Sequence, residues 1–522
     1  MQLRPTRIPR PLLPWRLQRC FPARRPFLTL AIETSCDDTA VAVVERGTQD
    51  HRAVARLHFH KKITSDNSQF QGVHPLVSLQ SHQENLALLV SEAISHLPPK
   101  PRLGRDDGQV QDPIDLQSRR LPDVISVTRG PGMRSSLFTG LDTAKGLATA
   151  WQIPLVGVHH MQAHALTPRL VSALEADSDP LDDEPLVNRQ GDETLLSSPE
   201  YPFLSLLASG GHTLLIHSAS LTDHRVLGGT NDIAIGEYLD KIARVLLPPE
   251  LLSTTKSTMY GSLLETFAFG EAWQAEAKLQ AKVDAQESSN ASMLFTSSSP
   301  TPRPLSDNDP ISATTYLDLH GRRYKWYEVA SNNEDTIRRS ATKWGWGFTQ
   351  PLTKVSGGTK IRSFEMSFSG LMTAVERVVR YGVDPTTKRL NKTERSACDI
   401  SLEERKDIAR ETMRIAFEHV CSRVILALQS LRELSTSDPA VVMAGGVAAN
   451  SFLRHILAST LCAQGFSDVH LHFPPPSLCT DNAAMIGWTG LEMLEAGHTD
   501  PLSIRAIRKW PLDKLLDPPT EG

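Results

Sequence analysis

Residues 27–44 read FLTLAIETSCDDTAVAVV, and this stretch decides the fold. Two short apolar runs, 27–32 and 41–44, flank a polar turn, which is the pattern of a β-hairpin whose tip presents hydroxyls and carboxylates. The pattern returns at 203–217, where the turn SGGHT joins two further apolar runs. Two such hairpins in successive halves of the chain predict an α/β fold of two duplicated lobes, with a ligand held in the cleft between them.

A pair of histidines follows the apolar run 154–158, which reads as a buried strand that leads into a helix. His160 and His164 are four residues apart, so on a helix both imidazoles lie on one face and can chelate one metal ion. Ligands often gather at the carboxyl ends of such strands. The alternative is that one or both histidines only cap or pack the helix.

A carboxylate stands at another predicted junction between a strand and a helix. The strand at 469–473 leads through three prolines to CTDN at 479–482 and to a helical stretch from 483. Thr480 or Asp481 is well placed to cap that helix. Asp481 could instead complete a site of two histidines and one carboxylate, and both interpretations stay open on the residues alone.

Two glycine-containing junctions could hold an anion. A predicted strand at 124–127 is followed by TRGPGMRSS at 128–136 and a helix at 137–150, where backbone N–H groups and Arg129 or Arg134 would suit a phosphate or carboxylate. A plain β-α connection is the alternative. The strand at 439–444 meets GGVAAN at 445–450, where glycines let a ligand approach the backbone before a helix begins.

The composition limits the class of protein. No run of about 18 uncharged apolar residues occurs, so we expect no membrane span. Six scattered cysteines without C-x-x-C spacing argue against a disulfide framework and a thiolate zinc site. Residues 1–27 hold seven arginines and no acid, which predicts a mitochondrial transit peptide, with a basic disordered tail as the alternative. Without that segment the net charge falls from -4 to about -11, so binding of nucleic acid needs a local basic patch or a partner.

These patterns predict four parts of the chain. They are a transit peptide at 1–27, an N-terminal lobe at 28–160, a C-terminal lobe at 161–487 and a C-terminal segment at 488–522. Stretches of low apolar content at 99–121, 173–200 and 275–312 cannot offset the entropy of ordering, so we expect them to be low-complexity insertions that form loops or stay disordered.

Taken together, the motifs resemble the tRNA threonylcarbamoyladenosine transferase family, in particular its mitochondrial branch. The motifs that carry the resemblance are IETSCDDT at 32–39, VTRGPGM at 127–133, HHMQAH at 159–164, SGGHT at 209–213, GEYLDKIAR at 236–244, SFSGL at 367–371, AGGVAAN at 444–450 and CTDNAAMI at 479–486. The resemblance implies an actin and sugar-kinase type of α/β fold, and it favours Asp481 as a metal ligand over a cap.

The resemblance also implies the site residues. One divalent metal ion per subunit, iron or zinc, would be held by His160, His164 and Asp481. The residues implied to contact the activated substrate are Leu207, Ala208, Ser209, Gly210, Gly211, Asp240 and Asn450. Gly261 is the counterpart of one more glycine contact, although its loop departs from the family pattern. An early loop departs too, with Leu76 and Gln80 where the family carries other residues.

The implied reaction transfers the threonylcarbamoyl group of L-threonylcarbamoyl-adenylate to N6 of adenosine 37 in mitochondrial tRNAs that read codons beginning with adenine, with release of AMP. A zinc protease would need a glutamate where Met161 stands. A small-molecule kinase would not need the metal site, and a non-catalytic scaffold is the third alternative. The resemblance implies a homodimer, and the most basic local stretch, 377–395, is a candidate surface for tRNA.

Overall fold

A computed structural model of the chain describes residues 25–49, 52–70, 72–100, 118–177, 197–254, 259–270, 311–339, 342–353, 362–396, 399–432 and 440–519. Residues 1–24 of the expected transit peptide and most of the three expected insertions lie outside the described residues. No helix of the described residues is long and apolar enough to cross a membrane. The described residues include four cysteines, and all are free thiols: Cys36, Cys421, Cys462 and Cys479.

The N-terminal sheet has five strands in the order β3-β2-β1-β4-β5. Its strands are β1 (Phe27–Glu33), β2 (Asp38–Gln49), β3 (Arg52–Thr64), β4 (Val124–Gly130) and β5 (Leu155–His159). The predicted hairpin is confirmed, since β1 and β2 pair antiparallel with Leu30 opposite Val43. β3 extends the hairpin on one side, and β4 and β5 follow in parallel on the other.

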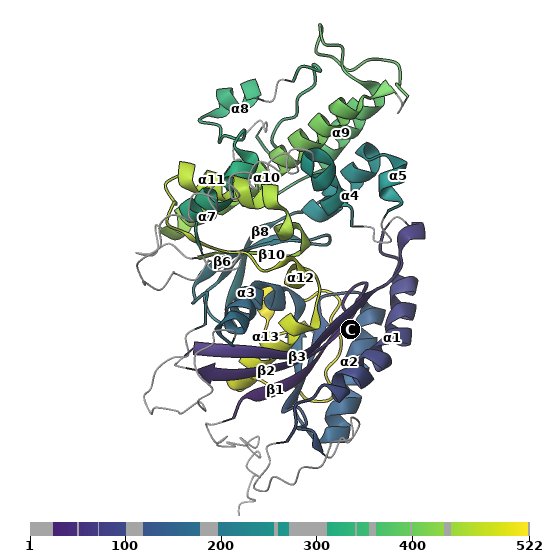
Figure 1. Ribbon diagram of the computed structural model, residues 1–522, viewed down its shortest axis with the longest axis vertical. Coiled ribbons are helices and arrows are strands. Elements are labelled where there is room, and N and C mark those ends of the chain that lie inside the picture. Colours follow the sequence, from purple (N-terminus) through teal and green to yellow (C-terminus); the bar gives the residue numbers. More distant parts are fainter. Residues whose placement is uncertain are drawn as a thin grey trace, which may run out of the picture.

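The C-terminal sheet repeats this order, as β8-β7-β6-β10-β11 with β9 added at the edge. Its strands are β6 (Phe203–Ala208), β7 (Thr213–Ser218), β8 (His224–Gly229), β9 (Ile311–Ser312), β10 (Ala440–Ala444) and β11 (His470–His472). β6, β7 and β8 form an antiparallel meander, and β10 and β11 run parallel to β6. The duplicated two-lobe α/β fold expected from the two hairpins is therefore confirmed, and Figure 1 shows one sheet above the other.

Helices cover both sheets. They are α1 (Pro75–Ser95), α2 (Arg134–Trp151), α3 (His160–Asp177), α4 (Ile235–Leu246), α5 (Pro249–Leu252), α7 (Ala313–His320), α8 (Asn333–Arg339), α9 (Ser369–Tyr381), α10 (Leu402–Arg432), α11 (Ser451–Ala463), α12 (Pro476–Cys479) and α13 (Ala483–Glu495). The largest apolar core lies in the C-terminal lobe, where the buried face of α10 meets α4, α9 and α11.

Helices that begin at or after the expected boundary at residue 160 also cover the N-terminal sheet. α3 and α13 both pack on the N-terminal sheet, opposite the face that α1 and α2 cover (Figure 1). Period-two alternation of β1 explains the two faces: Leu30 and Ile32 point toward α1 and α2, whereas Ala31 points toward α13. The N-terminal lobe is thus completed by a helix from near the end of the chain.

Small residues let α13 lie close to the sheet. A Cβ at Gly487 would lie 2.7 Å from Val44 Cγ2, and one at Gly490 would lie 2.0 Å from Ser126 Oγ. Both distances are far below van der Waals contact, so only glycine fits at these two positions. The close approach fixes the start of α13, and with it the position of the preceding Asp481.

Two expected insertions begin or end inside regular structure. Residues 173–177 belong to α3, because Ala173 is buried against the N-terminal sheet. Ile311 and Ser312 form β9, which pairs with β11 and buries Ile311. Composition alone placed these boundaries a few residues too far into the ordered chain, since single apolar residues at the edge of a polar stretch already have packing partners.

Candidate metal centre and substrate cleft

The two histidines lie at the start of α3, directly after β5. The spacing of four residues brings the rings together on one helical face, with centroids 4.7 Å apart and planes at 90°. Both side chains are buried. The predicted helix start is confirmed, and its two imidazoles point at the same place.

Asp481 completes a group of three. Its Oδ1 lies 3.0 Å from His164 Nε2 and 3.4 Å from His160 Nε2, and the three ligand atoms lie within 4.8 Å of one another. Thr480 and Asp481, the two candidate caps, do not cap α13, because Asn482 does so by accepting the Met485 N–H at 2.9 Å. The carboxylate of Asp481 is therefore directed at the histidines rather than at the helix.

Glu33, at the end of β1, stands behind His160. Its Oε2 lies 3.3 Å from His160 Nδ1, and its Oε1 accepts the Ser35 N–H at 2.6 Å. The Thr128 hydroxyl also donates to Glu33. A carboxylate on Nδ1 fixes the orientation of the ring, so that Nε2 faces Asp481. This role of Glu33 could not be predicted from the sequence, because it depends on the pairing of β1 beside β4 and β5.

The electrostatics of the group favour a positive charge at its centre. Burial lowers the pKa of His160, but the carboxylates of Asp481 and Glu33 outweigh it and raise that pKa to about 10. Burial likewise raises the pKa of Asp481, but the charge of His160 and its hydrogen bond bring it well below the ordinary value. Two imidazoles and the Asp481 carboxylate around one point are nitrogen and oxygen donors suited to a divalent transition metal. The residues present therefore fit such an ion.

Lys62 of β3 is a further residue at this site that the sequence analysis missed. Its Nζ donates to Asp38 Oδ2 at 2.9 Å and to Thr480 Oγ1 at 2.8 Å. Burial raises the pKa of Asp38 to about 6, and the charge of Lys62 opposes that rise. One side chain thus ties the first hairpin turn to the loop that carries Asp481. A lysine on an edge strand carries no sequence signal for such a contact.

The Ser-Gly-Gly turn between β6 and β7 is open on one side. A Cβ at Gly210 or Gly211 would meet no atom within 4 Å. On the other side, the Gly236 N–H of α4 donates to Ser209 O at 3.1 Å, so the helix start lies against the turn. The backbone of the turn is accessible to a ligand.

Leu207 and Ala208 differ from the rest of the expected substrate contacts. Their side chains are buried in the core at 1% and 0% exposure. Only their backbone could reach a ligand. The next loop lies alongside, because a Cβ at Gly445 would lie 2.4 Å from Ala208 O.

Asp240 and Gly261 lie side by side. Asp240 Oδ1 accepts the N–H of Tyr260 at 2.6 Å and of Gly261 at 3.1 Å, at the start of a helix over residues 261–270. Burial raises the pKa of Asp240 to about 6, although both N–H groups oppose that rise. The unusual loop before Gly261 is therefore anchored to Asp240.

Asn450 has a structural role that the sequence analysis did not predict. Its Oδ1 caps α11 by accepting the N–H groups of Phe452 and Leu453, both at 3.0 Å. The preceding 3-10 turn η6 (Gly446–Ala449) lies against the metal-centre loop, with 3.5 Å between a Cβ at Gly446 and Thr480 Cγ2. The glycine loop thus links the Ser-Gly-Gly turn to the loop of Asp481.

Three other candidates do not join this group. Arg129 pairs with Asp500 at 3.2 Å and donates to Arg505 O at 3.0 Å, so it holds the C-terminal segment. Leu76 is 70% exposed in the first turn of α1, and Gln80 on the same helix donates to Glu84 at 2.8 Å. The early-loop departures from the family pattern are therefore on the surface.

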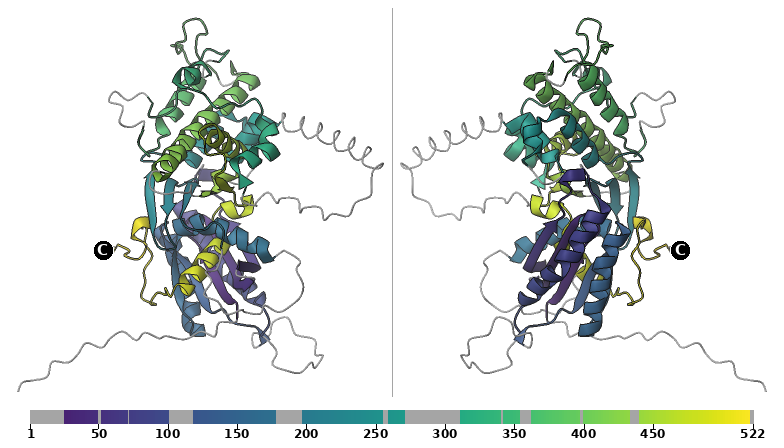
Figure 2. Two further views of the ribbon diagram at one scale, coloured as in Figure 1. Left: turned by 90° about the vertical axis from the view of Figure 1, so that its left-hand side faces the viewer. Right: turned by 90° about the vertical axis from the view of Figure 1, so that its right-hand side faces the viewer.

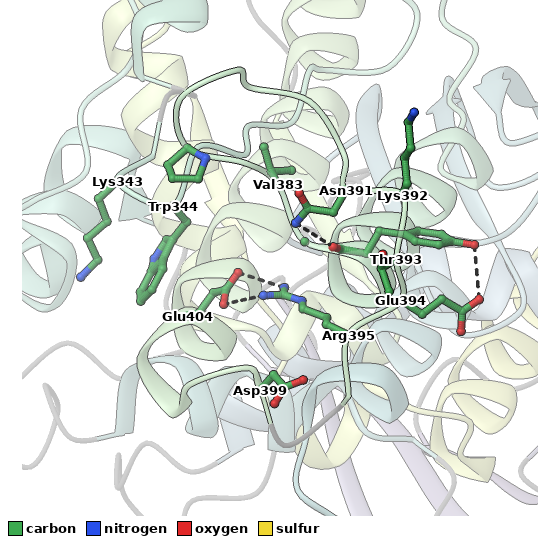
Figure 3. A pocket seen from close by; sticks show the side chains of 13 residues that line it. Lys343, Trp344, Val383, Asn391, Lys392, Thr393, Glu394, Arg395, Asp399 and Glu404 are labelled. Carbon is green, nitrogen blue, oxygen red and sulfur yellow. Dashed lines mark hydrogen bonds and ion pairs between the residues drawn. The ribbon is translucent and has the colours of Figure 1, made fainter.

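The basic stretch 377–395 surrounds a cavity of about 600 Å³ near the far end of the C-terminal lobe (Figures 1 and 3). Arg395 points inward and donates to both carboxylate oxygens of Glu404, at 2.9 and 3.0 Å. Arg380 pairs with Glu394 at 2.7 Å. Two of the six cations that made this stretch a candidate for binding tRNA are therefore paired with carboxylates of the protein.

Comparison with known proteins gives matches along almost the whole chain. A family model described as tRNA N6-adenosine threonylcarbamoyltransferase matches residues 113–181, 191–292 and 321–488. The mitochondrial tRNA N6-adenosine threonylcarbamoyltransferase of Schizosaccharomyces pombe is 31% identical, over 96% of this chain and 90% of the relative. The tRNA N6-adenosine threonylcarbamoyltransferase of Cereibacter sphaeroides is 29% identical, over 94% of this chain and 95% of the relative.

Among solved structures, full-length HypF superposes with a TM-score of 0.34 at 12% identity, over 91% of this chain and 47% of HypF, a likeness too low to carry an argument. The sequence matches are long and agree with one another. This chain belongs to the tRNA N6-adenosine threonylcarbamoyltransferase family.

Proposed function

We propose that the cleft binds L-threonylcarbamoyl-adenylate and that the protein transfers its threonylcarbamoyl group to N6 of adenosine 37 in tRNAs reading codons that begin with adenine. The protein is an acyltransferase of its family, it modifies tRNA adenosine and it acts in mitochondria, as the relative from fission yeast does. The observation that supports this proposal is the convergence of His160, His164 and Asp481 next to the glycine loops of the second lobe.

The proposed reaction does not require covalent catalysis by the protein. A carbamoyl-adenylate is a mixed anhydride, so its carbonyl is already activated and AMP is a good leaving group. No side chain has to act as a nucleophile, and the protein lowers the barrier by positioning the donor and by stabilising developing charge. We therefore assign no catalytic nucleophile.

His160, His164 and Asp481 would hold one metal ion per subunit, with Glu33 orienting His160. Such an ion would act as a Lewis acid that polarises or orients the threonylcarbamoyl group. Two imidazoles and one carboxylate suit iron and zinc alike. Lys62 would keep Asp481 in place through its contact with Thr480.

The donor's nucleotide part would lie against the second lobe. The open backbone of Ser209, Gly210 and Gly211 suits the phosphate, since N–H groups of a glycine turn can surround an anion. Asp240 and Asn450 would bind the ribose, beside Gly261 and the backbone of Leu207 and Ala208. The caps that Asp240 and Asn450 provide hold their side chains in fixed positions, which supports a role in recognition.

The second substrate is tRNA, and we propose that two copies of the chain form a homodimer. The test is purified protein with synthetic threonylcarbamoyl-adenylate and unmodified tRNA, read by mass spectrometry of the nucleosides, with light scattering to count subunits. Threonylcarbamoyl-adenosine should form. No product, with or without added iron or zinc, would contradict the proposed reaction.

Metal binding is tested separately. His160→Ala and Asp481→Ala should lose bound metal by elemental analysis and lose transfer, while far-ultraviolet circular dichroism stays unchanged. His96→Ala removes a histidine on the surface of the N-terminal lobe and serves as the control. Unchanged metal content in both site variants would refute the ligand assignment.

A further inference from the structure

The C-terminal segment after α13 runs along the outside of the molecule, past the level where the two sheets meet (Figure 2). It is pinned to the N-terminal lobe by Asp500, whose N–H donates to Leu155 O at 2.8 Å, and by the Ile507 N–H, which donates to Arg129 O at 2.8 Å. Farther along, Leu512 packs in a cluster with Leu207 and Ala444 of the second sheet. The segment therefore spans both lobes.

This segment alternates apolar and basic residues. Ile504, Ala506 and Ile507 are buried at 6%, 3% and 3% exposure. Arg505, Arg508 and Lys509 are exposed. The packing of the apolar residues thus holds a row of positive side chains at the surface.

A cavity of about 660 Å³ lies between this segment and the start of α2. Its lining consists of Arg129, Arg134, Phe138, Pro501, Ser503, Ile504, Arg505, Ala506, Ile507, Pro518 and Pro519, and none of these described residues is acidic. By contrast, the cavity of Figure 3 is lined by Glu394, Asp399 and Glu404 as well as by cations. In an acidic chain, a cavity lined by three guanidinium groups stands out.

The basic cavity is close to the metal centre. The Met133 N–H, one residue before Arg134, donates to Ser35 O at 2.8 Å, and Ser35 Oγ lies 3.3 Å from His160 Nδ1. On the other side, Trp510 O lies 3.0 Å from His159 Nε2. The walls of the cavity are therefore connected to the metal centre by hydrogen bonds through Ser35 and His159.

We propose that this groove binds the phosphodiester backbone of the substrate tRNA beside the nucleoside that is modified. Arginine forks are suited to phosphate oxygens, and a local basic surface is what an acidic protein needs to attract RNA. Phe138 is 42% exposed at the edge of the cavity, where an unpaired base of a loop can stack on it. Arg134 of α2 and Arg505 of the C-terminal segment line the cavity, and they provide the phosphate contacts.

This inference rests on the proposed function for the identity of the RNA, but its test does not need turnover. Binding of fluorescent, unmodified tRNA to the full-length protein is measured between 50 and 200 mM salt for Arg134→Ala, Arg505→Ala, the double variant and Phe138→Ala. Arg322→Ala, an exposed arginine of the C-terminal lobe, is the control.

The double variant should bind tRNA about fivefold more weakly or worse, and its plot of log Kd against log salt should be shallower by about 2, one for each lost phosphate contact. Phe138→Ala should weaken binding without changing the slope. Arg322→Ala should match the wild type, and binding of threonylcarbamoyl-adenylate should be unaltered in every variant.

Three results would overturn the groove. The first is wild-type affinity and slope in the Arg134→Ala/Arg505→Ala variant. The second is a loss of tRNA affinity in Arg389→Ala/Lys392→Ala instead. The third is normal tRNA binding by the Arg134→Ala/Arg505→Ala variant together with a loss of binding to phosphatidylglycerol vesicles in a flotation assay, which would assign the groove to a lipid headgroup. Failure of the wild type to make modified adenosine would refute the proposed reaction, while the binding data would still decide whether the groove holds RNA.

Discussion

Replacing Asp240 by asparagine tests the electrostatics of the cleft. The carboxylate accepts two backbone N–H groups, and an amide oxygen in the same place can still accept them. Burial nonetheless raises the pKa of Asp240 from 3.8 to about 6, so ionisation of this residue at neutral pH weakens the fold. D240N removes the ionisation and keeps the shape.

The magnitude follows from linkage between protonation and folding. The folded chain holds the proton more tightly than the unfolded chain, so the free energy of unfolding is highest below pH 3.8 and falls as pH rises through 6. The full loss is about 3 kcal/mol, and roughly half of it falls between pH 5 and pH 7.5. The amide of D240N does not titrate. Between pH 5 and pH 7.5 the free energy of unfolding of D240N should therefore rise, relative to that of the wild type, by about half of this 3 kcal/mol.

Urea denaturation of both proteins at pH 5 and at pH 7.5 measures how the stability difference between D240N and the wild type changes with pH. Any effect of the amide that does not depend on pH cancels in this comparison. Asp318→Asn, an exposed carboxylate of α7, is the control for loss of one charge. Affinity for threonylcarbamoyl-adenylate should fall in D240N although stability rises. A stability difference between D240N and the wild type that stays the same at the two pH values would refute the reasoning.

Three further changes test other contacts. Lys62→Met should cost about 1 kcal/mol in urea denaturation and lower the metal content, because Asp38 and Thr480 lose their shared donor, whereas Lys61→Met on the exposed neighbour should change neither. Asn450→Ala should cost about 1 kcal/mol as a lost cap and also weaken donor binding, measured by calorimetry; Ser312→Ala, the cap of α7, should only destabilise. Gly490→Ala should lower the thermal midpoint by the equivalent of about 1–3 kcal/mol, since its Cβ would overlap Ser126, and an unchanged midpoint would contradict the close packing of α13.

Local patterns predicted much of the fold. Both hairpins, the strand before His160 and the strand before Asp481 were readable because a period of two, a polar turn or a short apolar run is a property of neighbouring residues. β3 was not predicted, because it carries two lysines and a histidine-rich stretch along part of its length. Its assignment to the sheet depends on pairing with β2.

The site was predicted in part. His160 and His164 are close in sequence, so their convergence could be predicted from their spacing. Asp481 lies 317 residues beyond His164, and only the resemblance to a family indicated that it joins them. The resemblance already favoured Asp481 as a ligand over a cap, and the finding that Asn482 is the cap agrees with it. Glu33 and Lys62 stayed hidden because each acts through tertiary contacts.

The position of α13 has a consequence for how the protein is made. Ala31 on the first strand and Gly487 on the last long helix pack against each other, so one face of the N-terminal sheet stays uncovered until nearly the whole chain has been synthesised. Contacts this distant in sequence are slow to form. The first lobe therefore cannot be completed before α13 has been synthesised.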